Sequence, residues 1–470
     1  MVFHSLLVCG DNLHYEKFAD GSVKCIEDEI PFDLPEGWAW ARLNQIYNFI
    51  DYRGATPNKI SSGVPLITAK NVKSGYIDYT IDEYISEEEY WDRQQRGTSR
   101  LGDVLFTTEA PLGNAAIADI EKFSAGQRLI TFQHYGSCVL NNHTFLYFIL
   151  SDFFQDQLHT RKTGSTVAGI KASILKTLLL PIPPIAEQDK IGEKCENLLA
   201  LIEEITNSKQ SIISAIPKTK AKILDLAIRG KLVPQDPNDE PASVLLERIR
   251  AEKEELIKQG KLKRDKKESV IFRGEDNSYY EKIGGKVENI SDEIPFELPE
   301  GWAWCRGYSC FEGMESTKPQ GDFFDYIDID AIDNRLHCIK EAKHLPVSDA
   351  PSRASRAVKD GSVLFSLVRP YLENIALVEE KHSNCIASTG FYVCNSNGVL
   401  LPEFMFFLMI SGYVVNGLNQ YMKGDNSPSI SKDNIGNWLY PAPPVGEQQT
   451  ICAKLKTVFT LVENVEKSLN

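Results

Sequence analysis

Two long stretches of the chain carry apolar residues at three- and four-residue steps, the spacing of a helix that packs on another helix. In the first, residues 187–214, the stripe consists of Ile191, Cys195, Leu198, Ile202 and Ile205. In the second, residues 447–469, it consists of Ile451, Leu455, Val458, Val462, Val465 and Leu469. The pattern predicts two long helices paired antiparallel with each other; the alternative is that each lies on its own domain. The first would span roughly 40 Å, and Pro217 should break or restart it before a further turn over 221–228.

Shorter patterns occur in matching pairs. Residues 102–106 and 361–365 are apolar runs entered through a glycine, which favours strands. Residues 144–162 and 404–423 each follow the pattern of one amphipathic helix that leads to a glycine. Ser243 is expected to open a further, charged helix. Helices and strands are therefore mixed throughout the chain.

The pairing reflects an internal repeat. The segment from Asp28 to Trp40 recurs from Asp292 to Trp304, with only one change, from aspartate to glutamate. A second marker, Pro-x-Pro-Pro-x-x-Glu-Gln, ends each copy at residues 181–188 and 441–448. Because the markers keep the same order in both halves, we interpret the chain as a tandem duplication.

The interiors of the two copies differ strongly. Residues 53–57, 70–73 and 127–128 have no clear counterparts in the second copy. This contrast suggests one scaffold that presents two different recognition surfaces, although simple drift after an old duplication would also produce it. The expected fold class is α+β, with two tandem mixed α/β recognition domains separated by long helices that form an antiparallel coiled coil. The expected segments are an N-terminal partial repeat (1–26), a first domain (27–185), a spacer helix (186–230), a charged linker and helix (231–291), a second domain (292–445) and a distal helix (446–470).

Composition narrows the classes of function. The net charge of −14 argues against a protein that coats nucleic acid nonspecifically. The ten cysteines include no Cys-x-x-Cys pair and the eight histidines no metal-ligand spacing, so neither a metal site nor a disulfide framework is expected. Residues 164–171 resemble a phosphate loop but lack its lysine, and no other catalytic motif is found, so we expect a protein without catalytic residues. No apolar run is long enough for a membrane span and the N-terminus is a poor signal peptide, so a cytoplasmic location is expected.

Together the two markers, the helix after each copy and the segment Ile223–Gln235 resemble the specificity subunit of Type I restriction–modification enzymes. The resemblance covers nearly the whole chain. It implies two target recognition domains, each binding one half of a bipartite, asymmetric site in double-stranded DNA. The helices would set the spacing and dock modification subunits, expected to be two, while restriction and translocation subunits complete the enzyme. No cofactor is expected in this subunit, since ATP, Mg²⁺ and S-adenosylmethionine would act in the partners. A 40 Å spacer would also be close to one turn of DNA, roughly 34 Å.

One feature departs from the family. Members with this central segment commonly carry a copy of it before the first recognition domain, whereas residues 1–26 match only the stretch from about Phe272 onward, through Tyr15–Lys17 and Tyr280–Lys282. We therefore expect a truncated or rearranged subunit with an incomplete second docking site.

Candidate DNA contacts are polar residues expected in loops, because Arg, Lys, Asn, Gln, Ser and Thr contact base edges and phosphates. In the first domain they are Arg53, Thr56, Lys59, Lys70, Asn71, Lys73, Thr107, Thr108, Gln127 and Arg128. Lys162, Thr163 and Ser165, beside a glycine, suit a phosphate contact. In the second domain they are Lys318, Arg369, Tyr371, Asn374, Ser388, Thr389, Lys423 and Asn426. An ordinary solvated surface role is the alternative for each. Pro31, Trp38, Trp302 and the Pro-Pro pairs are expected to belong to the framework.

Two other functions fit the same features. The duplicated domains could bind proteins, with the coiled coil as a dimerisation arm. The chain could also be a silent specificity cassette that donates recognition domains for gene shuffling.

Overall fold

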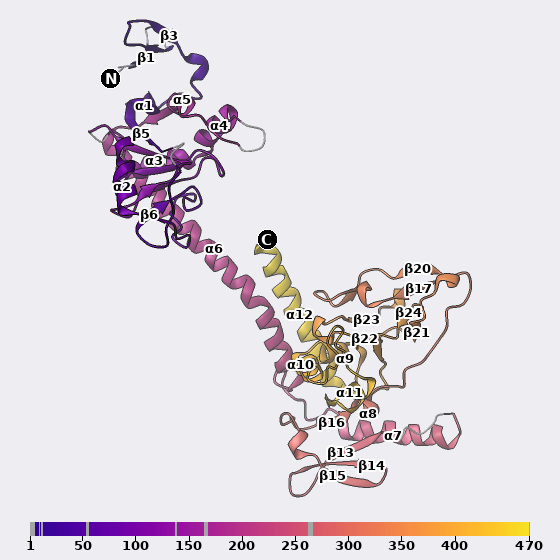
Figure 1. The fold of residues 1–470 in the computed structure, drawn as a ribbon. Helices are drawn as coiled ribbons and strands as arrows, with labels where there is room; N and C mark the ends of the chain where they lie inside the picture. Colours follow the sequence, from indigo (N-terminus) through magenta and orange to yellow (C-terminus); the bar gives the residue numbers. More distant parts are fainter. Residues whose placement is uncertain are drawn as a thin grey trace. The chain divides into compact units, whose positions relative to one another are not determined.

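The computed structural model describes residues 5–8, 10, 13–52, 56–136, 139–163, 168–261 and 267–469. The chain divides into two compact units, Met1–Thr206 and Asn207–Asn470, and the boundary falls inside the long helix α6 (Ile185–Ile228) (Figure 1). Each unit contains one copy of the repeat.

In each unit the two sequence markers pair as antiparallel strands. In unit 1, β4 (Ala39–Arg42) pairs with β12 (Leu179–Ile182), and Trp40 lies opposite Pro181. In unit 2, β16 (Ala303–Arg306) pairs with β26 (Leu439–Ala442), and Trp304 lies opposite Pro441. The same register in both units confirms the duplication and ties the start of each recognition domain to its end.

A small antiparallel sheet precedes each domain. Its order is β1-β2-β3 in unit 1 and β13-β14-β15 in unit 2. The bounds are Ser5–Val8, His14–Lys17 and Val23–Cys25 for the first, and Ser269–Arg273, Tyr279–Ile283 and Lys286–Asn289 for the second. Each sheet is fixed by a buried ion pair, Arg42 to Glu16 at 2.9 Å and Arg306 to Glu281 at 2.7 Å. The match between Tyr15–Lys17 and Tyr280–Lys282 is therefore structural.

The body of the first domain has a four-stranded sheet, β5-β11-β8-β9, and a three-stranded sheet, β10-β6-β7. In the same sheet order the strands are Tyr47–Asp51, Leu129–His134, Val104–Thr107, Ala115–Ile117, Ser124–Ala125, Val64–Ile67 and Tyr84–Ile85. The short helices are α1 (Leu43–Ile46), α2 (Glu87–Arg93) and α5 (Ala172–Leu175). Phe106 and Phe132 on the larger sheet pack with Phe145 and Phe154, which lie on helices, in one core.

The body of the second domain has three sheets where that of the first has two. Its sheets have the orders β20-β17-β24-β21, β18-β19 and β23-β22-β25. In that order the strands are Lys343–Pro346, Phe323–Ile327, Ile386–Ser388, Ala354–Ala357, Ile332–Asp333, Cys338–Ile339, Ile375–Leu377, Val363–Ser366 and Phe391–Cys394. The short helices are α8 (Gly307–Cys310) and α11 (Lys432–Asn437). β8 and β22 confirm the two strands predicted at residues 102–106 and 361–365.

The prediction of one amphipathic helix over 144–162 and another over 404–423 is wrong. Each is a pair of helices, α3 (Asn142–Leu150) with α4 (Asp152–Arg161), and α9 (Pro402–Met409) with α10 (Gly412–Asn419). The break falls at Ser151 and at Ser411. Each serine hydroxyl donates to the carbonyl three residues before it and accepts from the amide three residues after it, so each serine caps the second helix.

The expected break at Pro217 is also wrong, because α6, which is 44 residues long, continues through this proline. At about 1.5 Å per residue the helix is about 66 Å long, more than the 40 Å expected. Proline costs a helix interior roughly 3 kcal/mol. Here the Pro217 side chain is exposed, while Leu224, Ala227 and Ile228 pack in the core of unit 2. Burial of the apolar face of this helical segment therefore outweighs the lost hydrogen bond.

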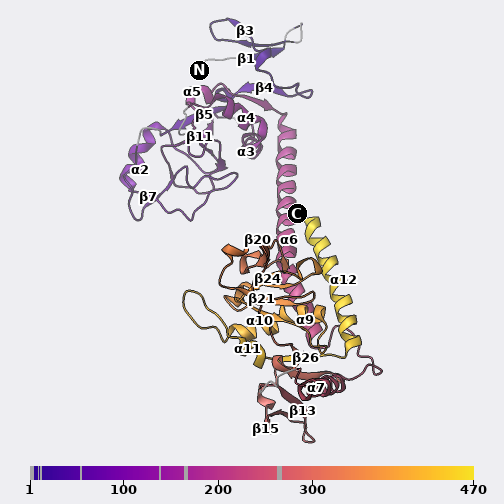
Figure 2. The same cartoon turned by 90° about the vertical axis from the view of Figure 1, so that its right-hand side faces the viewer.

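Within unit 2, the end of α6 lies antiparallel to α12 (Val445–Leu469), as Figure 2 shows. Gln235, shortly after α6, donates to Glu447 at the start of α12, and Lys220 lies 4.0 Å from Glu463 and 3.8 Å from Glu466 near its end. Antiparallel pairing with α12 therefore occurs at the end of α6, whereas Leu198, Ile202 and Ile205 of the stripe predicted to make it lie in unit 1 and are 50–59% exposed. The charged helix α7 (Ala242–Lys258) begins one residue before the expected Ser243.

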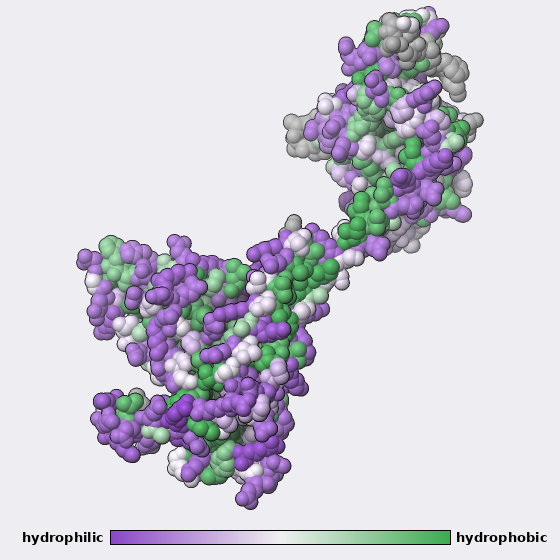
Figure 3. Space-filling model, turned by 180° about the vertical axis from the view of Figure 1, so that it is seen from behind, coloured by the Kyte–Doolittle hydropathy of each residue, from purple (hydrophilic) through white to green (hydrophobic). Residues whose placement is uncertain are grey.

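The part of α6 in unit 1 keeps an exposed apolar stripe. Leu198, Leu201, Ile202 and Ile205 are 50–59% exposed, and hydrophobic colour follows the helix in Figure 3. Across the described ranges, no helix combines the length and the apolar character needed to cross a bilayer.

Candidate nucleic-acid interface

In the first domain, five of the predicted contact residues line one cavity of about 200 Å³. They are Thr56, Lys59, Lys70, Gln127 and Arg128. The segment after β10 supplies the last two, and the segment leading into β6 supplies the first two. The Thr56 hydroxyl donates to the Gln127 side-chain carbonyl at 3.0 Å, which joins these segments. Residues more than 70 positions apart in sequence thus form one polar surface.

Each cation of this surface has a carboxylate beside it, which the sequence did not indicate. Glu83 lies 2.7 Å from Lys59 and 4.0 Å from Lys70, and Glu109 lies 3.1 Å from Arg128. Carboxylates repel phosphates but accept hydrogen bonds from the amino groups of cytosine and adenine. The mixture of donors and acceptors is therefore better suited to base edges than to the DNA backbone. No local sequence signal could have found these pairs, because the partners are distant along the chain.

Three of the predicted contacts in the first domain are buried, which corrects the expectation that they are exposed. Asn71 accepts from the Thr68 amide and hydroxyl and donates to the carbonyls of Asp78 and Ile81. Thr107 and Thr108 are 0% and 1% exposed and bond to backbone groups of Asn114 and Arg128. These side chains shape the loops, since polar residues in turns satisfy neighbouring backbone groups.

The other predicted residues of this domain lie apart from the cavity. Lys73 faces Asp78 at 3.9 Å on a separate loop. Lys162 and Thr163 are exposed after α4, and Thr163 pairs with Gly169, which in turn bridges to Glu109. Arg53 and Ser165 lie outside the described residues.

In the second domain, Arg369 and Asn426 come together although they lie far apart in sequence. The Arg369 guanidinium donates to the Asn426 backbone carbonyl at 3.0 Å, and both residues are exposed. Lys423 is exposed at the start of the same loop, where its backbone pairs with that of Ser429. Tyr371 is 47% exposed two residues after Arg369. These residues form one polar surface.

The remaining predicted residues of the second domain have different positions. Ser388 is fully buried and accepts from the Gly390 amide, so the expectation of a DNA contact there is corrected. Thr389 and Asn374 are half-buried, and Asn374 lines a separate hollow with Asp328 and Asp330. Lys318 is exposed on a segment that runs beside β21.

The two surfaces occupy equivalent positions in the two domains. Ala110 and Arg369, each preceding a proline, have φ angles of 45° and 49°. The Ile170 amide donates to the Thr108 carbonyl, as the Ile430 amide donates to the Leu367 carbonyl. The frame is therefore shared, while the side chains presented on it differ, with alanine in one copy where the other has arginine.

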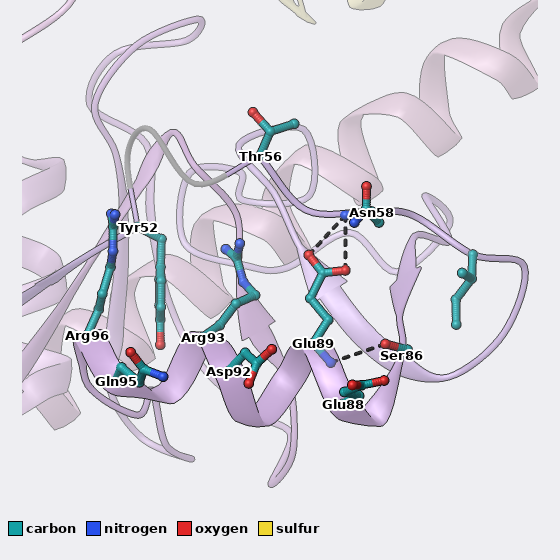
Figure 4. Close-up of a pocket in the computed structure, with 11 residues that line it drawn as sticks. Tyr52, Thr56, Asn58, Ser86, Glu88, Glu89, Asp92, Arg93, Gln95 and Arg96 are labelled. Atoms are coloured by element: carbon teal, nitrogen blue, oxygen red, sulfur yellow. Dashed lines mark hydrogen bonds between the residues drawn. The ribbon is translucent and has the colours of Figure 1, made fainter.

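A second hollow, of about 530 Å³, lies on the other side of Thr56 and has an acidic rim. Its lining includes Glu88, Glu89 and Asp92 from α2. Figure 4 shows Glu89 directed at the Asn58 amide, which donates to both carboxylate oxygens at 2.9 and 3.1 Å. Arg93 is buried beside the Tyr52 ring, and burial raises the pKa of that phenol. The three carboxylates outnumber the two arginines of the lining, Arg93 and Arg96, so the hollow disfavours phosphate.

Trp38 and Trp302, two of the residues expected to be framework, make matching structural contacts in the two domains. The indole of Trp38 donates to Glu187 at 2.9 Å, and that of Trp302 donates to Glu447 at 2.8 Å. Gln188 and Gln448 each bond to three backbone groups at the junction between the domain and the following helix. The Pro-x-Pro-Pro-x-x-Glu-Gln marker is thus the joint on which each long helix begins.

Comparisons with known proteins agree with this architecture. Residues 35–214 match the family model of the Type I restriction modification DNA specificity domain. The chain is 25% identical to the Type I restriction enzyme EcoAI specificity subunit of Escherichia coli, over 91% of this chain and 78% of that protein. It is also 25% identical to the Type I restriction enzyme EcoEI specificity subunit of Escherichia coli, over 94% of this chain and 81% of that protein. A chain in a solved structure of a type I R-M system shares the fold, with a TM-score of 0.51 and 16% identity over 93% of this chain and 94% of that one.

The fold defines a tandemly duplicated α+β protein with two equivalent polar loop surfaces and long spacer helices. Over more than nine-tenths of its length the chain is similar to Type I restriction enzyme specificity subunits, and residues 35–214 match the DNA specificity domain of this family.

Proposed function

We propose that this chain is the DNA sequence-specificity subunit of a Type I restriction–modification enzyme. Each recognition domain binds one half of a bipartite, asymmetric target in double-stranded DNA. The observation that carries the proposal is that one frame presents two different polar surfaces at equivalent positions, one around Gln127 and Arg128 and the other around Arg369 and Asn426. Different side chains on a shared frame are what two unlike half-sites require.

Catalysis belongs to partner subunits in this proposal. Modification subunits, two of them, would carry S-adenosylmethionine, and restriction subunits would use ATP and Mg²⁺. The exposed stripe Leu198, Leu201, Ile202 and Ile205 supports docking of a modification subunit, because a partner would cover this apolar surface. The chain itself would recognise DNA without catalysing a reaction, in the cytoplasm of its host.

The experiment is single-molecule methylome sequencing of a strain with and without this gene, in the presence of its modification subunit. We expect a bipartite methylated motif that disappears on deletion and returns when the wild-type chain is supplied from a plasmid. The control is a plasmid copy that lacks residues 292–445, which should not restore the motif. Identical methylomes with and without the gene would contradict the proposal.

A further inference from the structure

Arg356, on β21 of the second domain, is a largely buried cation. It exposes 8% of its surface, and its Nε is buried without a hydrogen-bond partner. Within the part of the chain that the structure describes, the Arg356 side chain forms no ion pair. A guanidinium stays protonated in proteins, and a buried charge without a partner is strongly unfavourable.

The other buried arginines of the chain contrast with it. Arg42 and Arg306 are each bound by two carboxylates. Arg93, 7% exposed in the first domain, donates to the Ser124 hydroxyl at 3.0 Å and to the Ala125 carbonyl at 2.8 Å. The guanidinium of each of these three arginines thus has hydrogen-bond partners within the described part of the chain. The unpartnered Nε of Arg356 is open to an external acceptor.

Arg356 lies on a strand that backbone hydrogen bonds connect to the Arg369 surface, and we call this connected region the platform. It lies opposite Ala387 in β24, and the chain then reaches Gly390, whose carbonyl accepts from the Leu367 amide at 2.7 Å. The Leu367 carbonyl accepts from the Ile430 amide at 2.9 Å. Lys432 follows two residues later. These backbone bonds connect the strand of Arg356 to the loop that carries Lys423 and Asn426.

Lys432 is the second cation of the platform. It follows Ile430, whose amide donates to the Leu367 carbonyl, by two residues, and partial burial together with the charge of Arg356 lowers the pKa of Lys432. The neighbouring carboxylate, Asp433, is held by Lys267 and by the Tyr308 hydroxyl. Among the described residues, no carboxylate forms an ion pair with Lys432.

We propose that Arg356 and Lys432 bind a phosphate group of the DNA backbone beside the half-site of the second domain. This proposal rests on the proposed DNA-recognition function. An anion suits both side chains, because a guanine edge accepts hydrogen bonds but does not neutralise a positive charge. The site would fix the register of the second domain on the duplex, while the neighbouring Arg369 surface contacts bases. Inorganic phosphate has the same chemistry and serves as a probe without DNA.

The test compares the full-length chain with its R356M and K432M variants. The matched control is K381M, since Lys381 is an exposed lysine paired with Glu379 outside this platform. For R356M we expect DNA affinity to fall roughly tenfold or more for all sequences alike, and the slope of log affinity against log salt to decrease by about one. K432M should change in the same direction and K381M should not change.

Thermal unfolding separates a binding role from a structural one. Without ligand, R356M should melt no lower than the wild type, because it removes an uncompensated buried charge. Millimolar inorganic phosphate should raise the melting temperature of the wild type but not that of R356M. A lower melting temperature of R356M without ligand, or an unchanged salt slope, would overturn the proposal. If the wild type binds no DNA, the proposed function fails; a phosphate shift that R356M abolishes would still support an anion site, and its absence would refute one.

Discussion

The indole nitrogen of Trp302 lies 2.8 Å from a carboxylate oxygen of Glu447 and donates a hydrogen bond to it, which joins the first marker of the second domain to the second. Trp38 and Glu187 form the same bond at 2.9 Å in the first domain. The environments differ, because Glu447 is 3% exposed and Glu187 is exposed to solvent. The same hydrogen bond thus occurs twice in the chain, once to a buried carboxylate and once to a carboxylate exposed to solvent.

This difference predicts unequal costs for the same substitution. W302F removes one of the two donors of a buried carboxylate and should lower the free energy of unfolding by about 1–3 kcal/mol. W38F should cost less, about 0.5 kcal/mol, because water replaces the indole at Glu187. Urea unfolding of both variants measures the two costs, and equal losses would contradict the role assigned to burial.

Glu447 should also make stability depend on pH. Burial raises the pKa of Glu447, while the bonds from Trp302 and Gln235 lower it in part. A carboxyl with a raised pKa binds its proton more tightly in the folded state, so its contribution to stability falls as pH rises from its unfolded pKa through its folded pKa. E447Q should remove this dependence. The stability of E447Q relative to the wild type should therefore increase as pH is raised from 4 to 7, measured by urea unfolding at each pH, and a constant difference would contradict the pKa shift.

The sequence predicted the frame better than the contacts. The repeated markers take the same register in both domains because their sequences are closely similar, and β8 and β22 follow from their apolar patterns. The splits at Ser151 and Ser411 were missed although a serine cap is a local signal, because the apolar spacing continues across them. Pro217 was misjudged because tertiary burial of Leu224 and Ile228 cannot be weighed from spacing.

The candidate site was predictable in composition but not in exposure. Thr56, Gln127 and Arg128 do meet, yet Asn71 and Ser388 are buried. A polar residue in a loop can serve either a ligand or the loop itself, and only the three-dimensional contacts distinguish the two. The carboxylate partners Glu83 and Glu109 depend on contacts between distant segments in the same way.

Neighbouring residues of one loop should therefore respond differently to alanine. N71A removes hydrogen bonds to Thr68, Asp78 and Ile81 and should lower the free energy of unfolding by about 1–3 kcal/mol. K70A removes a side chain that is 71% exposed and should change stability by no more than about 0.5 kcal/mol. If denaturant unfolding showed K70A to be as damaging as N71A, the assignment of Asn71 to the framework would be wrong.

Base recognition in the two half-sites should depend on different arginines. R369A should relax specificity in the half-site of the second domain by about 1–3 kcal/mol if the guanidinium is bidentate to guanine, and R128A should do the same for the other half-site only. Binding assays on targets mutated in one half-site at a time measure this. Each variant serves as the control for the other, because the two surfaces lie on separate domains of a common frame.

Glu109 provides a further test of base recognition in the first half-site. It lies 3.1 Å from the Nε of Arg128, whereas Arg369 is held by a backbone carbonyl that no side-chain substitution removes. E109Q should therefore loosen recognition in the first half-site without affecting the second. Because glutamine removes a negative charge, affinity for unrelated DNA should rise slightly. Specificity should therefore fall both because the target is bound less well and because unrelated DNA is bound better. A uniform loss of binding over all sequences in R128A or R369A would instead mark that arginine as a phosphate contact, since only a base contact makes the cost depend on sequence.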